Sequence, residues 1–362
     1  MAAGPSATRL EANSMAVLGP VTDAHRIDEA QLARWLADQG LPGAERGLRV
    51  MQFQGGQSNP TFHLEAGDDA YVLRKKPPGA LLPSAHMVER EYKVMAALAA
   101  TDVPVPVMRL LCEDTAVIGT AFYVMDYLEG RIPGEPSLDE GFDPDERAAI
   151  WDSMNDALAK LHKVDPAAVG LDGFGKPANY VGRQLDRWTK QFEASKTDPM
   201  PDMDALIEWL ASHEPPPDEV SIVHGDFRLP NLMLHPTEPR VIAILDWELS
   251  TLGHPLSDLA YNCMPYRMPY DEKALKGMVG LDLEALGIPA EEDYIAAYCR
   301  RTGRAGIPNL PFFQAFSFFR LAAICQGVYA RGLAGNASSL DALEVGAKAP
   351  RLAQIGWGIA SG

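Results

Sequence analysis

Hydrophobic residues in the first part of the chain follow two different periods. In residues 27–40 they recur at near-helical spacing until Gly40 and Pro42 end the pattern, which predicts a helix. Short runs rich in β-forming residues come next, separated by glycine and aspartate turns, and they predict strands at 48–53, 61–64, 70–74, 107–112 and 121–127. Between the third and fourth of these strands, an alanine-rich stretch predicts a helix at 84–99, with Ser84 as its candidate N-cap.

The pattern becomes helical after residue 143. Helices are expected at 144–164, 180–196, 202–213, 291–302 and 311–332, and one β-like island, 221–247, interrupts them. These patterns predict an α+β fold with two lobes, a small β-rich N-terminal lobe and a larger, mainly helical C-terminal lobe. We assign 1–24 to a flexible tail, 25–127 to the N-lobe and 128–362 to the C-lobe, and expect ligands between the lobes.

Charge narrows the classes of partner. The 362 residues include 32 Lys and Arg against 49 Asp and Glu, a formal net charge of −17. Binding to nucleic acid requires a basic patch, yet the chain contains no block of five or more basic residues. Anionic membranes would repel an acidic chain. We therefore expect neither a nucleic acid nor a membrane as a partner.

Further features predict a cytoplasmic protein. The four cysteines, at 112, 263, 299 and 325, form no CxxC pair and are expected to be buried thiols in a reducing compartment. The N-terminal residues lack a charged region followed by a long apolar run, so no signal peptide is predicted. The most apolar stretch, 312–330, contains Arg320 and two glutamines, which favours a buried helix over a membrane span.

The β-like island carries the most informative polar residues. An apolar strand leads into His224-Gly225-Asp226, Asn231 follows five residues after Asp226, and a second apolar strand ends on Asp246. If the flanking strands pair as a hairpin, these side chains converge at one end. Oxygen ligands from Asn231 and Asp246 suit Mg²⁺, which leaves the Asp226 carboxylate to orient or deprotonate a hydroxyl. The Asp-x-x-x-x-Asn spacing is the one that kinase catalytic loops use.

This segment resembles the aminoglycoside phosphotransferase and choline kinase family, whose fold is similar to that of protein kinases. The resemblance extends over about residues 45–335. It implies an ATP-dependent phosphotransferase with Asp226 as the catalytic base, Asn231 and Asp246 as ligands of Mg²⁺, and His224 as a structural member of the loop. In the same way, Asp258 resembles the structural aspartate that supports this loop.

Other segments resemble the nucleotide-binding parts of the same family. The loop 54–59 contains two glycines, which let backbone amides approach phosphates. Strand alternation favours Arg74 as the cation that contacts the phosphates, with Lys75 as the alternative. Glu91 resembles the carboxylate that pairs with this cation in the family, and Glu89 could compete for that role. A segment near Asp126 resembles the hinge that bonds the adenine edge. The expected nucleotide-binding residues are Gly55, Gly56, Ser58, Asn59, Arg74, Lys75, Glu91, Met125, Asp126, Tyr127 and Leu128.

The acceptor site carries arginines rather than a run of carboxylates. Arg228 follows the catalytic aspartate where many family members have histidine, and we predict that it contacts the transferring phosphate or an anionic substrate. Arg183, Arg187 and Arg320 are the expected substrate-binding residues. The segments around them resemble a branch of the family that is sometimes fused to an acyl-CoA dehydrogenase, which implies a hydroxy acid or hydroxyacyl-CoA as acceptor. The chain stops near residue 360, so no dehydrogenase domain is expected.

Other functions remain open at this point. A kinase-like pseudo-enzyme that binds nucleotide, or a kinase for aminoglycosides or amino alcohols, would share the same motifs. A protein kinase is disfavoured because the His-Arg-Asp, Asp-Phe-Gly and Ala-Pro-Glu set does not occur. A metal-dependent hydrolase built on His224, Asp226 and His254 would explain neither the glycine loop nor the hinge. The chain is expected to be a monomer or a homodimer.

Overall fold

The structure is a computed structural model, and it describes residues 18–54, 59–77, 86–139, 141–213, 217–270, 275–335 and 341–362. The chain divides into two compact units. The N-terminal unit comprises Met1–Pro133 together with Pro230–Leu249, and the helical unit comprises Gly134–Leu229 and Ser250–Gly362. The segment with the two expected metal ligands therefore belongs to the N-terminal unit.

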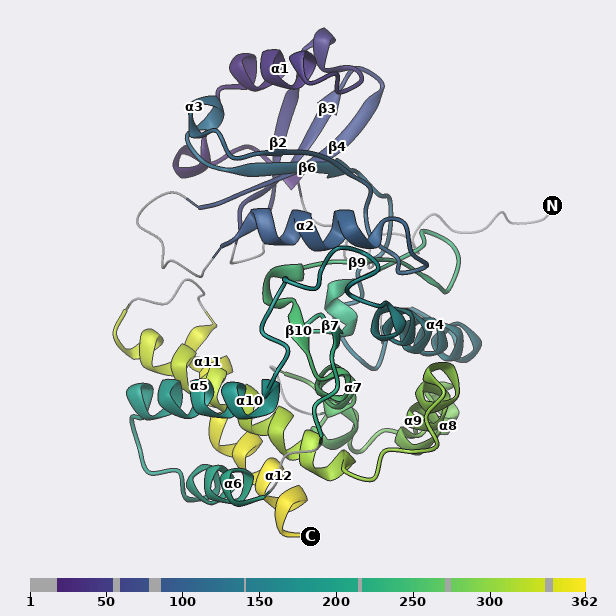
Figure 1. Cartoon of the computed structure of the whole chain (residues 1–362), viewed down its shortest axis with the longest axis vertical. Helices are drawn as coiled ribbons and strands as arrows, with labels where there is room; N and C mark the ends of the chain where they lie inside the picture. Colours follow the sequence, from purple (N-terminus) through teal and green to yellow (C-terminus); the bar gives the residue numbers. More distant parts are fainter. Residues whose placement is uncertain are drawn as a thin grey trace, which may run out of the picture. The chain divides into compact units, whose positions relative to one another are not determined.

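A six-stranded antiparallel sheet forms the centre of the N-terminal unit (Figure 1). Its strands have the order β1-β2-β3-β4-β6-β5. Their bounds are β1 Leu18–Gly19, β2 Arg49–Phe53, β3 Thr61–Ala66, β4 Asp69–Lys75, β6 Phe122–Asp126 and β5 Met108–Cys112. The five strands predicted from the sequence are all present. The sixth, β1, lies within the expected tail and pairs with the end of β2.

One face of this sheet is covered by α1 (Glu29–Asp38), and α2 (Val88–Leu98) also packs on the sheet. Alternating residues such as Phe62 and Leu64 point to the α1 face, where they form a core with Leu32 and Leu36. The Asp28 carboxylate caps α1 by accepting from the Gln31 amide at 2.9 Å. The expected cap Ser84 lies outside the described residues, and α2 begins later than predicted, after Met87.

A short hairpin completes the N-terminal unit. Its strands β8 (Leu232–Leu234) and β9 (Val241–Ile244) pair antiparallel, with Leu232 opposite Ile244. The Leu245 amide extends the ladder by donating to the Asn231 carbonyl at 2.8 Å. Asn231 and Asp246 therefore flank the same end of the hairpin, as the sequence predicted.

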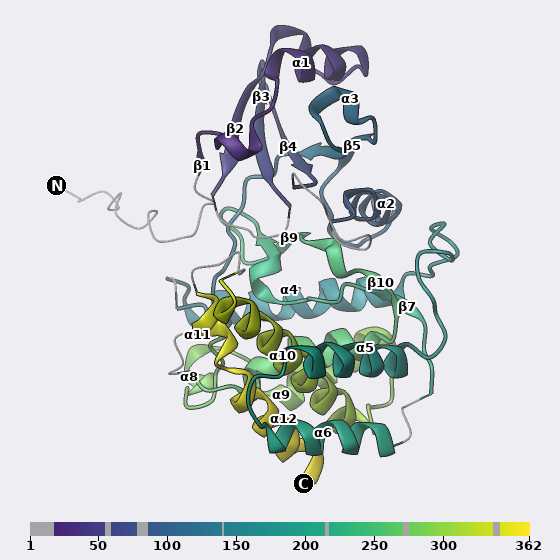
Figure 2. The same ribbon diagram turned by 90° about the vertical axis from the view of Figure 1, so that its left-hand side faces the viewer.

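The helical unit is built around one long helix, α10 (Leu310–Leu333). Its residues are buried over most of their length, because α5, α7, α11 and α12 all pack against it. Figure 2 shows α5 beside α10 and α6 beside α12. The other helices are α4 (Pro144–Lys163), α5 (Tyr180–Ser195), α6 (Pro201–Ser212), α7 (Pro255–Asn262), α8 (Leu283–Leu286), α9 (Glu291–Thr302), α11 (Ala342–Gly346) and α12 (Ala349–Ser361). Two strands, β7 (Ser221–Val223) and β10 (Thr251–Gly253), pair beside α7.

Several expectations about burial are confirmed. All four cysteines are free and buried. Arg320 and Gln326 lie inside α10 and are almost fully buried, so the most apolar stretch is a core helix. No helix among the described residues is long and apolar enough to cross a membrane.

The α1 core provides a stability test. Leu36 is fully buried, so Leu36→Ala removes apolar contacts and leaves a cavity. We expect the free energy of unfolding to fall by about 2–4 kcal/mol, measured by urea denaturation. Leu249→Ala is the control, because the Leu249 side chain is 44% exposed in the same unit and should change stability by about 0.5 kcal/mol or less. Equal effects of the two variants would contradict this account of the core.

Candidate active site

Arg74 lies on the sheet face opposite α1 and pairs with two carboxylates. It is followed by Lys75 on the α1 face, because side chains alternate along β4. Its Nε lies 3.2 Å from Oε2 of Glu91, and its Nη2 donates to Oδ1 of Asp246 at 2.9 Å. The surrounding carboxylates raise the pKa of Arg74 against the opposing effect of burial. The structure thus places a permanent cation beside one of the expected metal ligands.

Glu91 is buried, and hydrogen bonds to both carboxylate oxygens fix its position. Its Oε1 accepts from Asn59 Nδ2 at 2.8 Å, and its Oε2 accepts from the Tyr123 hydroxyl at 3.1 Å. Burial raises the pKa of Glu91 to about 7, opposed chiefly by the Arg74 charge. Asn59 was expected to bind nucleotide. In the structure its Nδ2 donates a hydrogen bond to Glu91, and its Oδ1 is hydrogen-bonded to Nδ1 of His86.

The other basic residues, Lys75 at the end of β4 and Lys76 after it, have different partners. Lys75 donates its Nζ to the carbonyl of His25 at 3.2 Å and lies over the Phe62 ring. Lys76 pairs with Glu89 at 2.9 Å, so Glu89 does not compete with Glu91 for Arg74. The geometry favours Arg74 over Lys75 as the cation for phosphates. Gly55, Gly56 and Ser58 lie outside the described residues.

A cavity of about 560 Å³ lies in the N-terminal unit beside the expected hinge. Its lining is mainly apolar and comprises Leu18, Phe53, Thr61, Val72, Pro106, Met125 to Ile132, Met233, Pro236 and Leu245. The Asp126 carboxylate does not offer a free charge, because Arg109 binds both of its oxygens, at 2.6 and 2.8 Å. An apolar cavity of this size matches the requirements of a flat aromatic ligand such as a nucleotide base.

Backbone groups of the hinge differ in their availability. The Asp126 amide donates to the Val107 carbonyl at 2.9 Å, and the Tyr127 amide donates to the Ala70 carbonyl at 3.2 Å. Within the described ranges, no residue accepts the amide of Leu128, which also lines the cavity. Leu128 is therefore the hinge residue whose N–H is available to a ligand.

The residues expected to bind Mg²⁺ fit that ion by chemistry. Asn231 is nearly buried at one end of the hairpin, and the Asp246 side chain is 33% exposed. Asp246 has a φ of 61°, in the left-handed region that non-glycine residues rarely adopt, which is typical of functional positions. Amide and carboxylate oxygens are ligands that Mg²⁺ prefers. Among the described residues, no group of three or more His, Cys, Asp or Glu is arranged to hold a metal ion.

The loop with Asp226 belongs to the helical unit and is held by Asp258 of α7. The Asp258 carboxylate accepts the amides of His224 and Gly225 at 2.6 and 2.9 Å. His162 lies 3.4 Å from the same carboxylate. Burial opposes ionisation, but the hydrogen bond and charge of His162 prevail and lower the pKa of Asp258.

His224 and Arg228 flank the expected catalytic base from within the loop. The His224 ring is fully buried, and its Nδ1 accepts the Asp226 amide at 3.2 Å, which is a structural role. Arg228 is half exposed, and its Nε lies 3.2 Å from Oδ1 of Asp226. The Arg228 guanidinium and the Asp226 carboxylate thus form an ion pair that is partly exposed.

The three arginines expected to bind substrate have different surroundings. Burial raises the pKa of Tyr180, and the positive charges of all three arginines oppose this rise. Arg183 donates to the Lys176 carbonyl, and Arg187 is exposed beside Trp188. Arg320 is only 5% exposed and donates to the carbonyl of Gly225, so it contacts the loop that carries Asp226 directly.

Sequence reasoning missed one residue of this site. Burial and the Asp226 charge raise the pKa of Tyr261 in α7, and its ring lies 4.8 Å from the Arg320 guanidinium. Its spacing of three from Asp258, which places both on one helix face, was the available signal.

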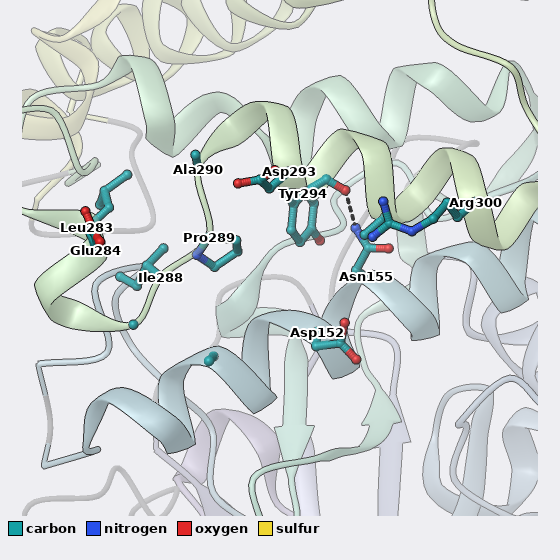
Figure 3. A pocket seen from close by; sticks show the side chains of 13 residues that line it. Asp152, Asn155, Leu283, Glu284, Ile288, Pro289, Ala290, Asp293, Tyr294 and Arg300 are labelled. Atoms are coloured by element: carbon teal, nitrogen blue, oxygen red, sulfur yellow. Dashed lines mark hydrogen bonds between the residues drawn. The ribbon is translucent and has the colours of Figure 1, made fainter.

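A second cavity, of about 620 Å³, lies in the helical unit between α4, α8 and α9 (Figure 3). Its floor includes Asn155, whose Nδ2 donates to the Tyr294 carbonyl at 2.8 Å and whose oxygen accepts from Arg301. Asp152 at the rim pairs with Arg301 at 2.7 Å. These polar groups tie α4 to α9, and we assign them a structural role.

Comparison with known proteins identifies the family. Residues 49–305 match the sequence model of the phosphotransferase enzyme family. The chain therefore belongs to this family, and it has the α+β kinase-like fold with a β-sheet N-terminal region and a helical C-terminal region. The family prediction made from the residues around Asp226 is confirmed.

Two similar proteins define the branch of the family. Acyl-CoA dehydrogenase family member 10 of Mus musculus is 46% identical over 94% of this chain, but the match covers only 32% of that protein. A solved structure of a candidate aminoglycoside phosphotransferase from Ralstonia eutropha is 48% identical, covers 93% of this chain and 99% of its own, and has a TM-score of 0.85. The chain thus spans about a third of the mouse relative.

A more distant structure shares the fold. The aminoglycoside phosphotransferase APH(4)-Ia, solved with ADP and hygromycin B, has a TM-score of 0.59 at 16% identity, with 91% of this chain and 98% of that chain covered.

The role of Asp258 leads to a stability prediction. Asp258→Ala leaves two buried loop amides without an acceptor, so the free energy of unfolding should fall by about 3 kcal/mol. Urea denaturation measures this change. Asp186→Ala is the matched control, because the Asp186 carboxylate is 66% exposed and pairs only with Lys190 on the surface. If both variants are as stable as the parent, Asp258 does not hold the loop.

Proposed function

We propose that this protein transfers the γ-phosphate of ATP to a hydroxyl group of a small molecule. The observation that carries the proposal is the Arg74 guanidinium, fixed by Glu91 and paired with the Asp246 carboxylate at 2.9 Å. A buried cation beside a carboxylate with an unusual backbone conformation is an arrangement for binding phosphates and a divalent cation. A purely structural ion pair would not require the left-handed conformation of Asp246.

The N-terminal unit is proposed to bind the nucleotide. The cavity beside Met125 would accept the base, with the amide of Leu128 as a donor to its edge. Arg74 would neutralise phosphate oxygens. Mg²⁺, held by Asn231 and Asp246, would supply charge that stabilises the transferring phosphoryl group. The ADP complex of the distant relative APH(4)-Ia is consistent with this assignment.

The helical unit is proposed to supply the base. Asn231 lies five positions after Asp226, a stretch that spans at most ~18 Å of chain, so the same short loop links the base and the metal ligand. Asp226 would orient the acceptor hydroxyl. The acceptor oxygen would bond to the γ-phosphorus as the bond to the β–γ bridging oxygen breaks, and the hydroxyl proton would pass to the Asp226 carboxylate. Positioning and electrostatics would account for most of the rate.

The proposed acceptor is a hydroxy acid or a hydroxyacyl-CoA. Arg183 and Arg187 contribute positive charge near Tyr180, and Arg228 adds a half-exposed guanidinium next to Asp226. Such groups suit a carboxylate or the phosphates of coenzyme A better than a polycationic antibiotic. The name of the mouse relative, an acyl-CoA dehydrogenase family member, agrees with an acyl-CoA acceptor. The cytoplasmic location and the monomeric or dimeric state stay predictions.

Replacing Asp226, the proposed base, should affect the chemical step but not the binding of ATP. Asp226→Asn keeps the shape of the side chain but cannot accept a proton at the same oxygen. We expect kcat to fall by about a hundredfold or more, with little change in the affinity for ATP. The assay follows the gain of one phosphate by mass spectrometry in a panel of hydroxy acids, hydroxyacyl-CoAs, amino alcohols, sugars and aminoglycosides. Unchanged turnover in Asp226→Asn would exclude Asp226 as the base, and phosphorylation of aminoglycosides alone would overturn the acyl acceptor.

The assignment of the phosphate cation has its own test. Arg74→Met removes the guanidinium that pairs with Asp246, so the KM for ATP should rise by about tenfold or more. Lys75→Met is the matched control, since Lys75 lies on the opposite face with the His25 carbonyl as its partner. Its KM for ATP should stay within about twofold of the parent value. A larger effect of Lys75→Met than of Arg74→Met would reverse the assignment.

A further inference from the structure

The short strand β1 extends the sheet of the N-terminal unit at its β2 edge (Figure 2). It consists of Leu18 and Gly19, which lie opposite Phe53 and Gln52 of β2. Residues directly opposite each other on paired strands point to the same face of a sheet, so Leu18 shares its face with Phe53. Both side chains line the cavity beside the hinge. A segment that was expected to be part of a flexible tail therefore contributes to the wall of this cavity.

The residues that follow β1 are anchored to the sheet. Val21 packs against the core between the sheet and α1. The Gln52 side chain binds the next residue twice, because its Oε1 accepts from the Thr22 amide at 3.0 Å and from the Thr22 hydroxyl at 3.3 Å. These anchors lie three and four positions after Leu18, so they restrict the backbone of β1 and keep the Leu18 side chain at the cavity.

Strand β1 also lies against the start of the loop 54–59, which was expected to bind nucleotide. A Cβ atom at Gly19 would lie 2.7 Å from Nε2 of Gln54, so a larger residue at position 19 would displace the Gln54 side chain. Glycine thus permits the close approach of β1 to residue 54.

A row of rings connects the β1 edge of the cavity to the hinge. The ring centroids of Phe53 and His63 lie 6.3 Å apart, and those of His63 and Tyr127 lie 4.7 Å apart, both in edge-to-face contact. Phe53 and Tyr127 line the cavity, and His63 is buried between them. These two short steps bring the β1 edge within reach of a ligand that also contacts the hinge.

We propose that Leu18 is a nucleotide-binding residue, because β1 closes one side of the cavity and the Leu18 side chain packs against the nucleoside part of ATP. This inference rests on the proposed function, which assigns the cavity to the base. Leu18 has no polar group, so it contributes by burying apolar surface of the ligand. Its effect is therefore the same for nucleotides with one, two or three phosphates, unlike that of Arg74.

Leu18→Ala removes the contact with the nucleoside. Isothermal titration calorimetry should show a Kd for ADP raised by about fivefold or more, because apolar surface that the parent buries is lost. The Kd for AMP should rise by the same factor, because the lost contact does not involve phosphate. Leu48→Ala is the matched control. The Leu48 side chain is also partly buried, but it packs against the core with α1 and is not among the residues that line the cavity, so its Kd for ADP should stay within about twofold of the parent value.

Three results would contradict the role of Leu18. Parent-like affinity of Leu18→Ala for ADP would overturn it, and so would an equal loss of affinity in Leu48→Ala, which would indicate a general weakening of the unit. A weaker affinity for ADP with an unchanged affinity for AMP would place Leu18 at the phosphates instead of the nucleoside. Failure of the parent protein to bind ADP would refute the proposed function, and this inference with it.

Discussion

The loop that carries Asp226 depends on one buried carboxylate. Asp258 is almost completely inaccessible to solvent, and burying a charge without partners would be strongly unfavourable. Two loop amides and His162 supply those partners. Because each donor is itself buried, neither side of the interaction can exchange to water, and these bonds hold the backbone of the loop in place. The position of Asp226 follows from that arrangement.

The N-terminal unit also holds a buried carboxylate, that of Glu91, through an ion pair and hydrogen bonds. One continuous ion network joins distant parts of the sequence, because Arg74 of β4 pairs with Glu91 of α2 and with Asp246 after β9. The hydroxyl of Tyr123 and the amide of Asn59 satisfy the remaining capacity of Glu91. The network holds a cation beside a candidate metal ligand.

Much of this could be predicted from the sequence, because the relevant signals are local. The alternation of β4 separated Arg74 from Lys75, and the spacing of Asp226 and Asn231 indicated the loop. Contacts between elements left weaker signals. Tyr261 is one aromatic residue in a helix, where burial in the core is the usual explanation. The contact of Arg320 with the Gly225 carbonyl joins residues 95 positions apart, which no local pattern reveals.

Short and glycine-containing helices were also missed. Helix α12 contains Gly356 and Gly358, which weaken a helical pattern in the sequence. In the structure Gly356 packs closely against Leu206 and Phe318, where a side chain would not fit, so tertiary packing overrides the local preference. The start of α2 was misplaced for a comparable reason, since Met87 at its N-cap provides no side-chain signal.

The central claim is that phosphate passes from ATP to an organic hydroxyl, and a single-turnover experiment tests it most directly. Enzyme in excess is mixed with Mg²⁺, γ-labelled ATP and a candidate acceptor, and the label is followed in each product. The account predicts that the label appears in the phosphorylated acceptor. Label released only as inorganic phosphate, with every class of acceptor, would contradict it.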